Sequence, residues 1–497
     1  MVAKTDKLTA QARKFIARGE AGETELGALA EVCDRLIRSE TQSNPRKAAA
    51  MARRFVVHAR PVGGVLLITA LRALGWALHN SGSYQEARDV YLEARSLLGR
   101  DPLMRARVDR ILIDVFMYLG DTKAARKHFH SALTTFERLG ENVDAAKTRV
   151  NYANVLHRQD RHREAGLQYR KAVKVWEATD DTVSQAICYY NLANTLSQSF
   201  DFEQATSLYQ KAERAYASQG HDLYANDCRY GLAWLQLLQG NYHQALTGLA
   251  ECEAVSQQAG QAKGVMLCQL DRAETYLALR LFTDARYFAA MAEKGAHRLG
   301  LRYEAAKAAL FSSRASMAIG DRFAARKALA RAGSGFKETD SRAFLGVVEF
   351  LSASDSKNRR VKSAVMRRAR GYFTDAQLPL WEAISDLECL ATNPGDGLVR
   401  RRLKRNRAVQ AVPHLYATWH TLLGDQCRDT GQIAAARRHW TQAADMLDSV
   451  RIKLPAVEAR SLIAQRADDP HSRLVSSLKV DHPAEAAVWS ERRRTAG

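Results

Sequence analysis

Proline and strand-like patterns are both scarce in this sequence. Nine of its 497 residues are proline, and no segment shows the sustained alternation of apolar and polar residues that is typical of a half-buried strand. Proline breaks the interior of a helix, so its rarity permits many uninterrupted helices. We therefore predict an all-α fold class.

Cysteine and metal-ligand patterns are also sparse. The seven cysteines are odd in number, scattered, and form no CxxC pair, which favours small core residues in a reducing compartment over a disulfide framework. His128 and His130 are two positions apart, so on a helix they point about 200° from each other and cannot share a metal ion. We predict neither a metal nor a cofactor.

Sequence motifs for common active sites and for membrane insertion are absent. There is no Gly-rich phosphate loop, no HExxH and no GxSxG, so we predict that the chain is not an enzyme. The N-terminal stretch from Met1 to Gly19 lacks the apolar core of a secretory signal, and Arg72 interrupts the most apolar run, Val62 to Leu78. We expect no membrane span and a cytoplasmic location.

One pattern does recur, at a spacing of about 40 residues. In both copies a helix with apolar residues three and four apart is followed by a polar break and a second amphipathic helix. Neither helical hairpin could cover its apolar face alone, so neighbouring hairpins must stack. The matching residues are Asn151, Ala153, Leu156, Ala165, Tyr169 and Ala172, which return as Asn191, Ala193, Leu196, Ala205, Tyr209 and Ala212.

The same template fits further segments before and after this pair. A small residue is followed after twelve positions by Ala, after four more by an aromatic or Leu, and after three more by Ala. This spacing resembles the tetratricopeptide (TPR) repeat. The resemblance implies an α-solenoid, a right-handed superhelix of antiparallel helix pairs with a period of about 40 residues. The turns between paired helices are expected at Gly82, Gly120, Asp160, Phe200, Gly240, Arg280, Gly320 and Gly431.

The quality of the repeat divides the chain into five parts. We predict divergent N-terminal hairpins at 1–60, the regular array at 61–340, degenerate and basic helical repeats at 341–412, a C-terminal TPR at 413–450, and a helical segment at 451–497. The stretch from Leu447 to Arg492 resembles the connector that joins the TPR array to the caspase-like peptidase domain in bacterial TPR-CHAT proteins. The peptidase domain itself has no counterpart here, so none of that family's catalytic residues can be carried over.

Polar and aromatic residues recur on the first helices, which line the concave face in TPR proteins. Asparagine carries a donor and an acceptor and can bind the backbone of an extended peptide; the alternative is that these residues only hydrogen-bond between adjacent hairpins. In chaperone-binding TPR domains, side chains at five positions of the repeats hold a C-terminal carboxylate. Asp227 and Gly231 occupy the last two of these positions here, so that role is not expected. The candidate groove residues are Lys147, Asn151, Asn154, Asn191, Asn194, Tyr230 and Trp234.

Positive charge is concentrated between Lys357 and Arg407, within a chain of net charge +20. Such a basic region can neutralise nucleic-acid phosphates, or it can be a solvated helix face. The sequence therefore leaves three functions open: a scaffold that binds a protein partner such as a separately encoded CHAT peptidase, a nucleic-acid adaptor, and a fragment of a larger CHAT peptidase. The candidate basic residues are Arg359, Arg360, Arg367, Arg368, Arg400, Arg401 and Arg402.

Overall fold

The computed structural model describes residues 2–20, 25–159, 161–339, 341–354, 359–375, 378–453 and 469–495. Within these ranges the chain forms 26 α-helices and no strand, which confirms the all-α prediction. None of the helices in the described ranges is both long and apolar enough to cross a membrane. The chain divides into two compact units, residues 1–158 with 164–180 and residues 159–163 with 181–497. The division lies within the predicted regular array.

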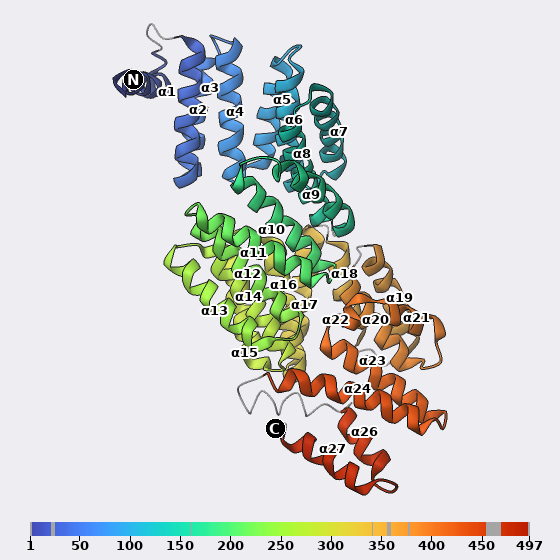
Figure 1. Cartoon of the computed structure of the whole chain (residues 1–497). Helices are drawn as coiled ribbons and strands as arrows, with labels where there is room; N and C mark the ends of the chain where they lie inside the picture. The colour runs from blue at the N-terminus through green and yellow to red at the C-terminus, as the bar shows by residue number, and fades with distance from the viewer. Residues whose placement is uncertain are drawn as a thin grey trace. The chain divides into compact units, whose positions relative to one another are not determined.

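Figure 1 shows the helices in chain order. The first unit holds α1 (Val2–Arg18), α2 (Leu26–Ser43), α3 (Pro45–Ala59), α4 (Gly64–Asn80), α5 (Tyr84–Leu97), α6 (Pro102–Tyr118), α7 (Thr122–Leu139), α8 (Asn142–Arg158) and most of α9 (His162–Trp176). The second holds α10 (Thr182–Gln198), α11 (Phe202–Ser218), α12 (Asp222–Leu238), α13 (Tyr242–Gln258), α14 (Ala262–Ala278), α15 (Phe282–Arg298), α16 (Arg302–Ile319), α17 (Arg322–Glu338), α18 (Arg342–Ser354), α19 (Arg359–Asp375), α20 (Pro379–Thr392), α21 (Gly397–Arg405), α22 (Arg407–Ala411), α23 (Pro413–Asp429), α24 (Ile433–Arg451), α26 (Pro470–Leu478) and α27 (Pro483–Thr495).

The predicted hairpin period is present in these bounds. The first helices α8, α10, α12 and α14 begin at a constant interval, at residues 142, 182, 222 and 262. The alanines at the hairpin crossings are fully buried, as Ala165, Ala205 and Ala245 show at 0% exposure. Their small side chains let paired helices approach closely, which is the packing that the sequence template predicts.

Large aromatic side chains fill the space beside residues that must be small. Tyr209 on α11 is fully buried, and a Cβ atom on Gly231 of α12 would lie within 3.0 Å of its ring. Trp440 on α24 meets Gly424 on α23 in the same way. At these two places an aromatic ring on a second helix excludes any residue larger than glycine at the facing position of a first helix.

Two turns adopt a backbone conformation that is unfavourable for their residues. Phe200 and Arg280 have φ angles of 60° and 63°, in the left-handed region that non-glycine residues seldom occupy. The Phe200 side chain packs against a cluster from α20 to α23 that includes Val409, Leu415 and Trp419. This apolar contact offsets part of the backbone cost at Phe200.

The C-terminal part of the second unit folds back onto its own hairpin turns. Ala417 of α23 and Leu447 of α24 pack against Leu237 and Leu279, which precede the turns at Gly240 and Arg280. The amine of Lys453 also donates a hydrogen bond to the Asn241 side chain at 2.9 Å. The array is thus covered along its turns by a hairpin from a much later part of the chain.

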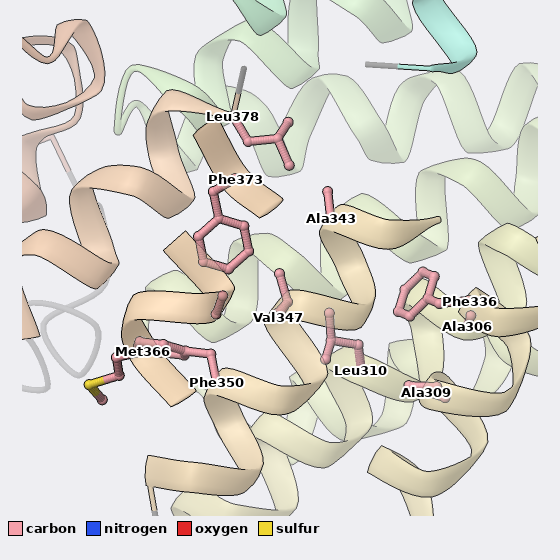
Figure 2. Packing of buried hydrophobic residues seen from close by; sticks show 12 residues of the cluster. Ala306, Ala309, Leu310, Phe336, Ala343, Val347, Phe350, Met366, Phe373 and Leu378 are labelled. Atoms are coloured by element: carbon pink, nitrogen blue, oxygen red, sulfur yellow. The ribbon is translucent and has the colours of Figure 1, made fainter. Parts of the chain in front are cut away.

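Apolar packing continues without a break from the regular array into the segment after it. Figure 2 shows Leu310, Phe336, Val347 and Phe373, which come from α16, α17, α18 and α19 and belong to one buried cluster. The helices of the predicted degenerate region therefore share a core with the hairpin before them.

A buried polar network attaches α26 and α27 to α24. His471 is 2% exposed, and its two ring nitrogens lie 3.0 Å from Asp448 and 2.9 Å from Asp469. Burial alone would lower the pKa of His471, but the hydrogen bonds to the two carboxylates outweigh burial and raise it. The imidazolium therefore links the start of α26 to α24. Residues 454–468 of the predicted connector lie outside the described residues.

All seven cysteines lie in described ranges and are free thiols, five of them buried. Burial raises the pKa of Cys188 to about 12, so this thiol stays protonated at neutral pH. The prediction of small core residues is confirmed for the five buried cysteines.

Candidate functional site

The first helices of the second unit form a continuous layer. α10, α12, α14 and α16 contact one another in succession, in addition to their contacts with the second helices. We call the side of this layer that bears Asn191, Asn194, Tyr230, Trp234, Glu274 and Arg314 the first-helix face. Asn194, Trp234, Glu274 and Arg314 occupy the same register position in four successive hairpins.

The candidate groove residues of the first unit contact other parts of that unit. Asn151 donates a hydrogen bond from Nδ2 to the backbone oxygen of Arg110 on α6, at 3.1 Å. Lys147 lies over the Trp176 ring, with 5.7 Å between Nζ and the ring centroid. Asn151 thus joins adjacent hairpins, as the alternative interpretation of these asparagines describes.

Asn154 and Asn194 make the same hydrogen bond in successive hairpins. Each accepts at Oδ1 from a tyrosine hydroxyl 15 residues later, Asn154 from Tyr169 at 2.5 Å and Asn194 from Tyr209 at 2.7 Å. A buried hydroxyl needs a hydrogen-bond partner. In each hairpin the asparagine amide therefore satisfies the hydroxyl of the tyrosine whose ring fills the hairpin. This constant spacing within each hairpin is a sequence signal that could have predicted the pairing.

The other candidates in the second unit have different environments. Tyr230 donates to Asp271 Oδ2 at 2.5 Å, and the half-buried Trp234 packs against the cluster that contains Leu447 of the folded-back hairpin. The side chain of Asn191 has no hydrogen-bond partner within the described ranges. The Asn191 amide therefore has a donor and an acceptor that no described residue satisfies.

Ionisable residues on the first-helix face were missed as site candidates. Asp271 is 3% exposed, and burial raises its pKa to about 6 although Lys307 acts in the opposite direction. Burial also lowers the pKa of Arg314, which Glu274 partly counteracts. For Arg314 and Glu274 the described part of the chain shows no ion pair within 4.0 Å. Their register could have identified Glu274 and Arg314 from the sequence. Glu274 occupies the position of Trp234 one hairpin later, and Arg314 occupies it two hairpins later.

Several candidate basic residues are held by acidic or polar partners. Arg402 and Arg370 both bind Asp386, which is 2% exposed, with nitrogen–oxygen distances of 2.7 and 2.9 Å. Arg368 pairs with Glu349 at 2.9 Å. These arginines neutralise buried or nearby carboxylates.

The remaining basic candidates vary in exposure. Arg400 donates to the Gln426 side chain at 3.1 Å, and Arg401 donates to the backbone oxygen of Gly397 at 3.4 Å. Arg367 is exposed, whereas the side chains of Arg359 and Arg360 lie outside the described residues. The five candidates whose side chains are described do not lie together as a set of unpaired cations.

His128 binds Asp109 through Nδ1 at 2.8 Å. Over the described ranges, no group of three or more His, Cys, Asp and Glu side chains could hold a metal ion.

Comparisons with known proteins identify the repeat. The family described as Tetratricopeptide repeat matches residues 104–178 and 144–218, so this part of the chain carries TPR repeats. A comparison with curated protein sequences found no match.

Solved structures that match this chain include the following three. A Rap protein complexed with Competence and Sporulation Factor has a TM-score of 0.53 and 11% identity, covering 78% of this chain and 99% of that one. A Signal Transduction ATPase with Numerous Domains from Pyrococcus horikoshii, with a TPR sensor, has a TM-score of 0.47 and 13% identity. The match covers 69% of the present chain, which spans 55% of the length of the ATPase. The apo quorum sensor NprR from B. thuringiensis has a TM-score of 0.43 and 11% identity, covering 73% and 94%. The Rap likeness supports a TPR-like solenoid, an architecture that points to protein partners.

Proposed function

We propose that the chain is a non-enzymatic scaffold that binds an extended segment of a protein partner on the first-helix face of its second unit. The observation that supports this most directly is the unused binding capacity of that face. Arg314, Glu274 and Asn191 are half-buried yet have no ion pair or side-chain hydrogen bond to the described parts of the chain. Half-buried polar groups of this kind gain most from a partner that supplies hydrogen bonds.

Apolar residues beside these groups add contact area for the same segment. Ile187 is 41% exposed and lies one turn before Asn191 on α10. Tyr190 is half-buried and lies next to Asn191. A partner segment with alternating polar and apolar side chains would therefore meet both kinds of surface.

We further propose that the partner is a separately encoded caspase-like peptidase of the CHAT type, or a comparable effector, and that its folded domain docks on the C-terminal helices. The support is the sequence resemblance of Leu447 to Arg492 together with the exposure of Ile452 and Val480, at 78% and 87%. Two separate contacts would give a tighter complex than either alone, because the first raises the effective concentration of the second.

The test is a pull-down from the native host followed by titration of the recovered partner. Asn191→Ala and Arg314→Ala should remove roughly 0.5–1.5 and 1.5–3 kcal/mol, so that together they weaken binding about 30-fold or more. Val480→Asp should weaken it independently. Arg326→Ala, an exposed arginine on α17, is the matched control and should leave the affinity unchanged.

Two results would contradict the proposal. If the partner bound the Asn191 and Arg314 variants as tightly as the control, the first-helix face would not be the binding site. Recovery of no protein partner would count against a scaffold altogether.

A further inference from the structure

One hairpin of the second unit has glycine at a position where its two neighbours have a large apolar side chain. Residue 248 of α13 is glycine, whereas the residues at the same position of the preceding and following hairpins are Leu208 and Phe288. An open hollow of about 380 Å³ lies at this place between α12 and α13. Its volume is within the range of about 300–1,000 Å³ that ligand pockets occupy.

The next hairpin shows what the hollow would hold. There the Phe288 ring stacks on Tyr276 with centroids 5.4 Å apart, and the guanidinium carbon of Arg272 lies 4.1 Å from the Phe288 centroid. The equivalent residues of the α12–α13 hairpin are Gly248, Gln236 and Leu232, all of which line the hollow. The hollow therefore lies where the next hairpin has an aromatic side chain and the ring on which that side chain stacks.

The lining combines apolar side chains with exposed charged ones. Leu232, Ala233 and Val255 supply apolar surface, while the exposed Arg229 and Glu251 stand at the edge. Such a rim admits a side chain carried on another protein and leaves that protein's backbone in solvent. An amphipathic ring suits this combination, because its face is apolar and its edge can carry a donor.

A buried acceptor beside the hollow adds a polar feature. Asn226 is 3% exposed and donates from Nδ2 to the Cys252 backbone oxygen at 3.2 Å. Its Oδ1 atom has no hydrogen-bond partner in the described part of the chain. An indole or phenol group in the hollow would bring a donor to this side of the hairpin.

We propose that this hollow is a socket for an aromatic side chain, tryptophan or tyrosine, presented by a partner protein. The socket is separate from the first-helix face. Its test is independent of the test of the function proposed above. The partner's ring takes the place that Phe288 occupies in the following hairpin.

The test uses 5-fluoro-N-acetyl-tryptophanamide as the probe and ¹⁹F NMR line broadening of the full chain as the measurement. Saturable broadening is expected at about millimolar probe, because a ligand of this size gains limited affinity. Gly248→Phe places the chain's own ring in the socket and should abolish the broadening. Gly248→Leu reproduces the preceding hairpin and should weaken binding at least fivefold, which keeps the test valid if the Phe variant folds poorly.

A control separates filling of the socket from a change in the helix itself. Gly248→Ala adds only one methyl group, 3.0 Å from the Ala233 Cβ atom, and should retain most of the binding. N-acetyl-leucinamide should compete at least tenfold less well than the aromatic probe. Unchanged broadening in the Gly248→Phe variant, equal competition by the leucine compound, or no saturable binding to the unmodified chain would each overturn the socket.

Discussion

Replacing Gly231 by alanine should destabilise the second unit, although alanine is the better helix former. In an exposed helix the change would stabilise by about 0.5–1 kcal/mol. At this position the new Cβ atom would lie within 3.0 Å of the fully buried Tyr209 ring. The ring must shift, and its 2.7 Å hydrogen bond to Asn194 must lengthen or break.

The expected size follows from these opposing effects. Overpacking costs about 1–3 kcal/mol, and the lost hydrogen bond costs a further 0.5–1.5 kcal/mol or so. After subtraction of the helix-propensity gain, we expect a net loss of about 0.5–4 kcal/mol in the free energy of unfolding. Gly371→Ala on α19 is the matched control, because no atom lies within 4 Å of the place that its methyl group would take, and it should stabilise by up to about 1 kcal/mol.

Native-state hydrogen exchange is the appropriate assay, because it locates the change within a repeat array. Exchange should accelerate in α11 and α12 and change little in α26, since hairpins contact mainly their neighbours. Adding Tyr209→Leu to the Gly231→Ala variant should recover part of the loss, because Leu249 occupies the equivalent position one hairpin later. The reasoning would be refuted if Gly231→Ala stabilised the chain as Gly371→Ala does.

The remaining predictions concern pH and salt. Because the pKa of His471 is raised in the folded chain, its stabilisation is complete below about pH 6.5 and is lost as pH rises through the folded pKa; exchange in α26 should accelerate over that window, and His471→Gln should remove the pH dependence. Because many arginines of the basic region are paired with Asp386 or other partners, we expect no retention on RNA at about 150 mM salt. Nanomolar, salt-sensitive RNA binding that disappears in an Arg367→Ala, Arg401→Ala double variant would instead support the nucleic-acid function.

The helix pairs were predictable because their causes are local and periodic. The regular recurrence of small residues places helix crossings, and the polar breaks place turns, so the helix starts at 142, 182, 222 and 262 follow from the pattern. The same repetition explains the hydrogen bonds from Tyr169 to Asn154 and from Tyr209 to Asn194. A repeated residue pair has a repeated environment when each hairpin meets an equivalent neighbour.

The candidate site was less predictable, because the contacts of a polar side chain depend on its neighbours in space. An asparagine pattern alone does not distinguish Asn151, which binds the Arg110 backbone, from Asn191. Nor does arginine content show that Arg370 and Arg402 share one buried carboxylate. These pairings do not recur at matching positions of successive hairpins, so the repeat pattern gives no basis for predicting them.

The sequence by itself determined the fold class, the hairpin period and the places where only small residues can lie, because each depends on interactions within one hairpin or between adjacent ones. Only the tertiary structure decided where the last hairpins pack. Lys453 donates a hydrogen bond to Asn241, and Leu447 packs on Leu237. The apolar surface near the turns is buried by a segment that is distant in sequence, so no local pattern predicts these contacts. Identification of the hollow at Gly248 requires both the sequence and the structure. The repeat shows that a side chain is missing, and the packing shows that nothing else in the described chain fills the space.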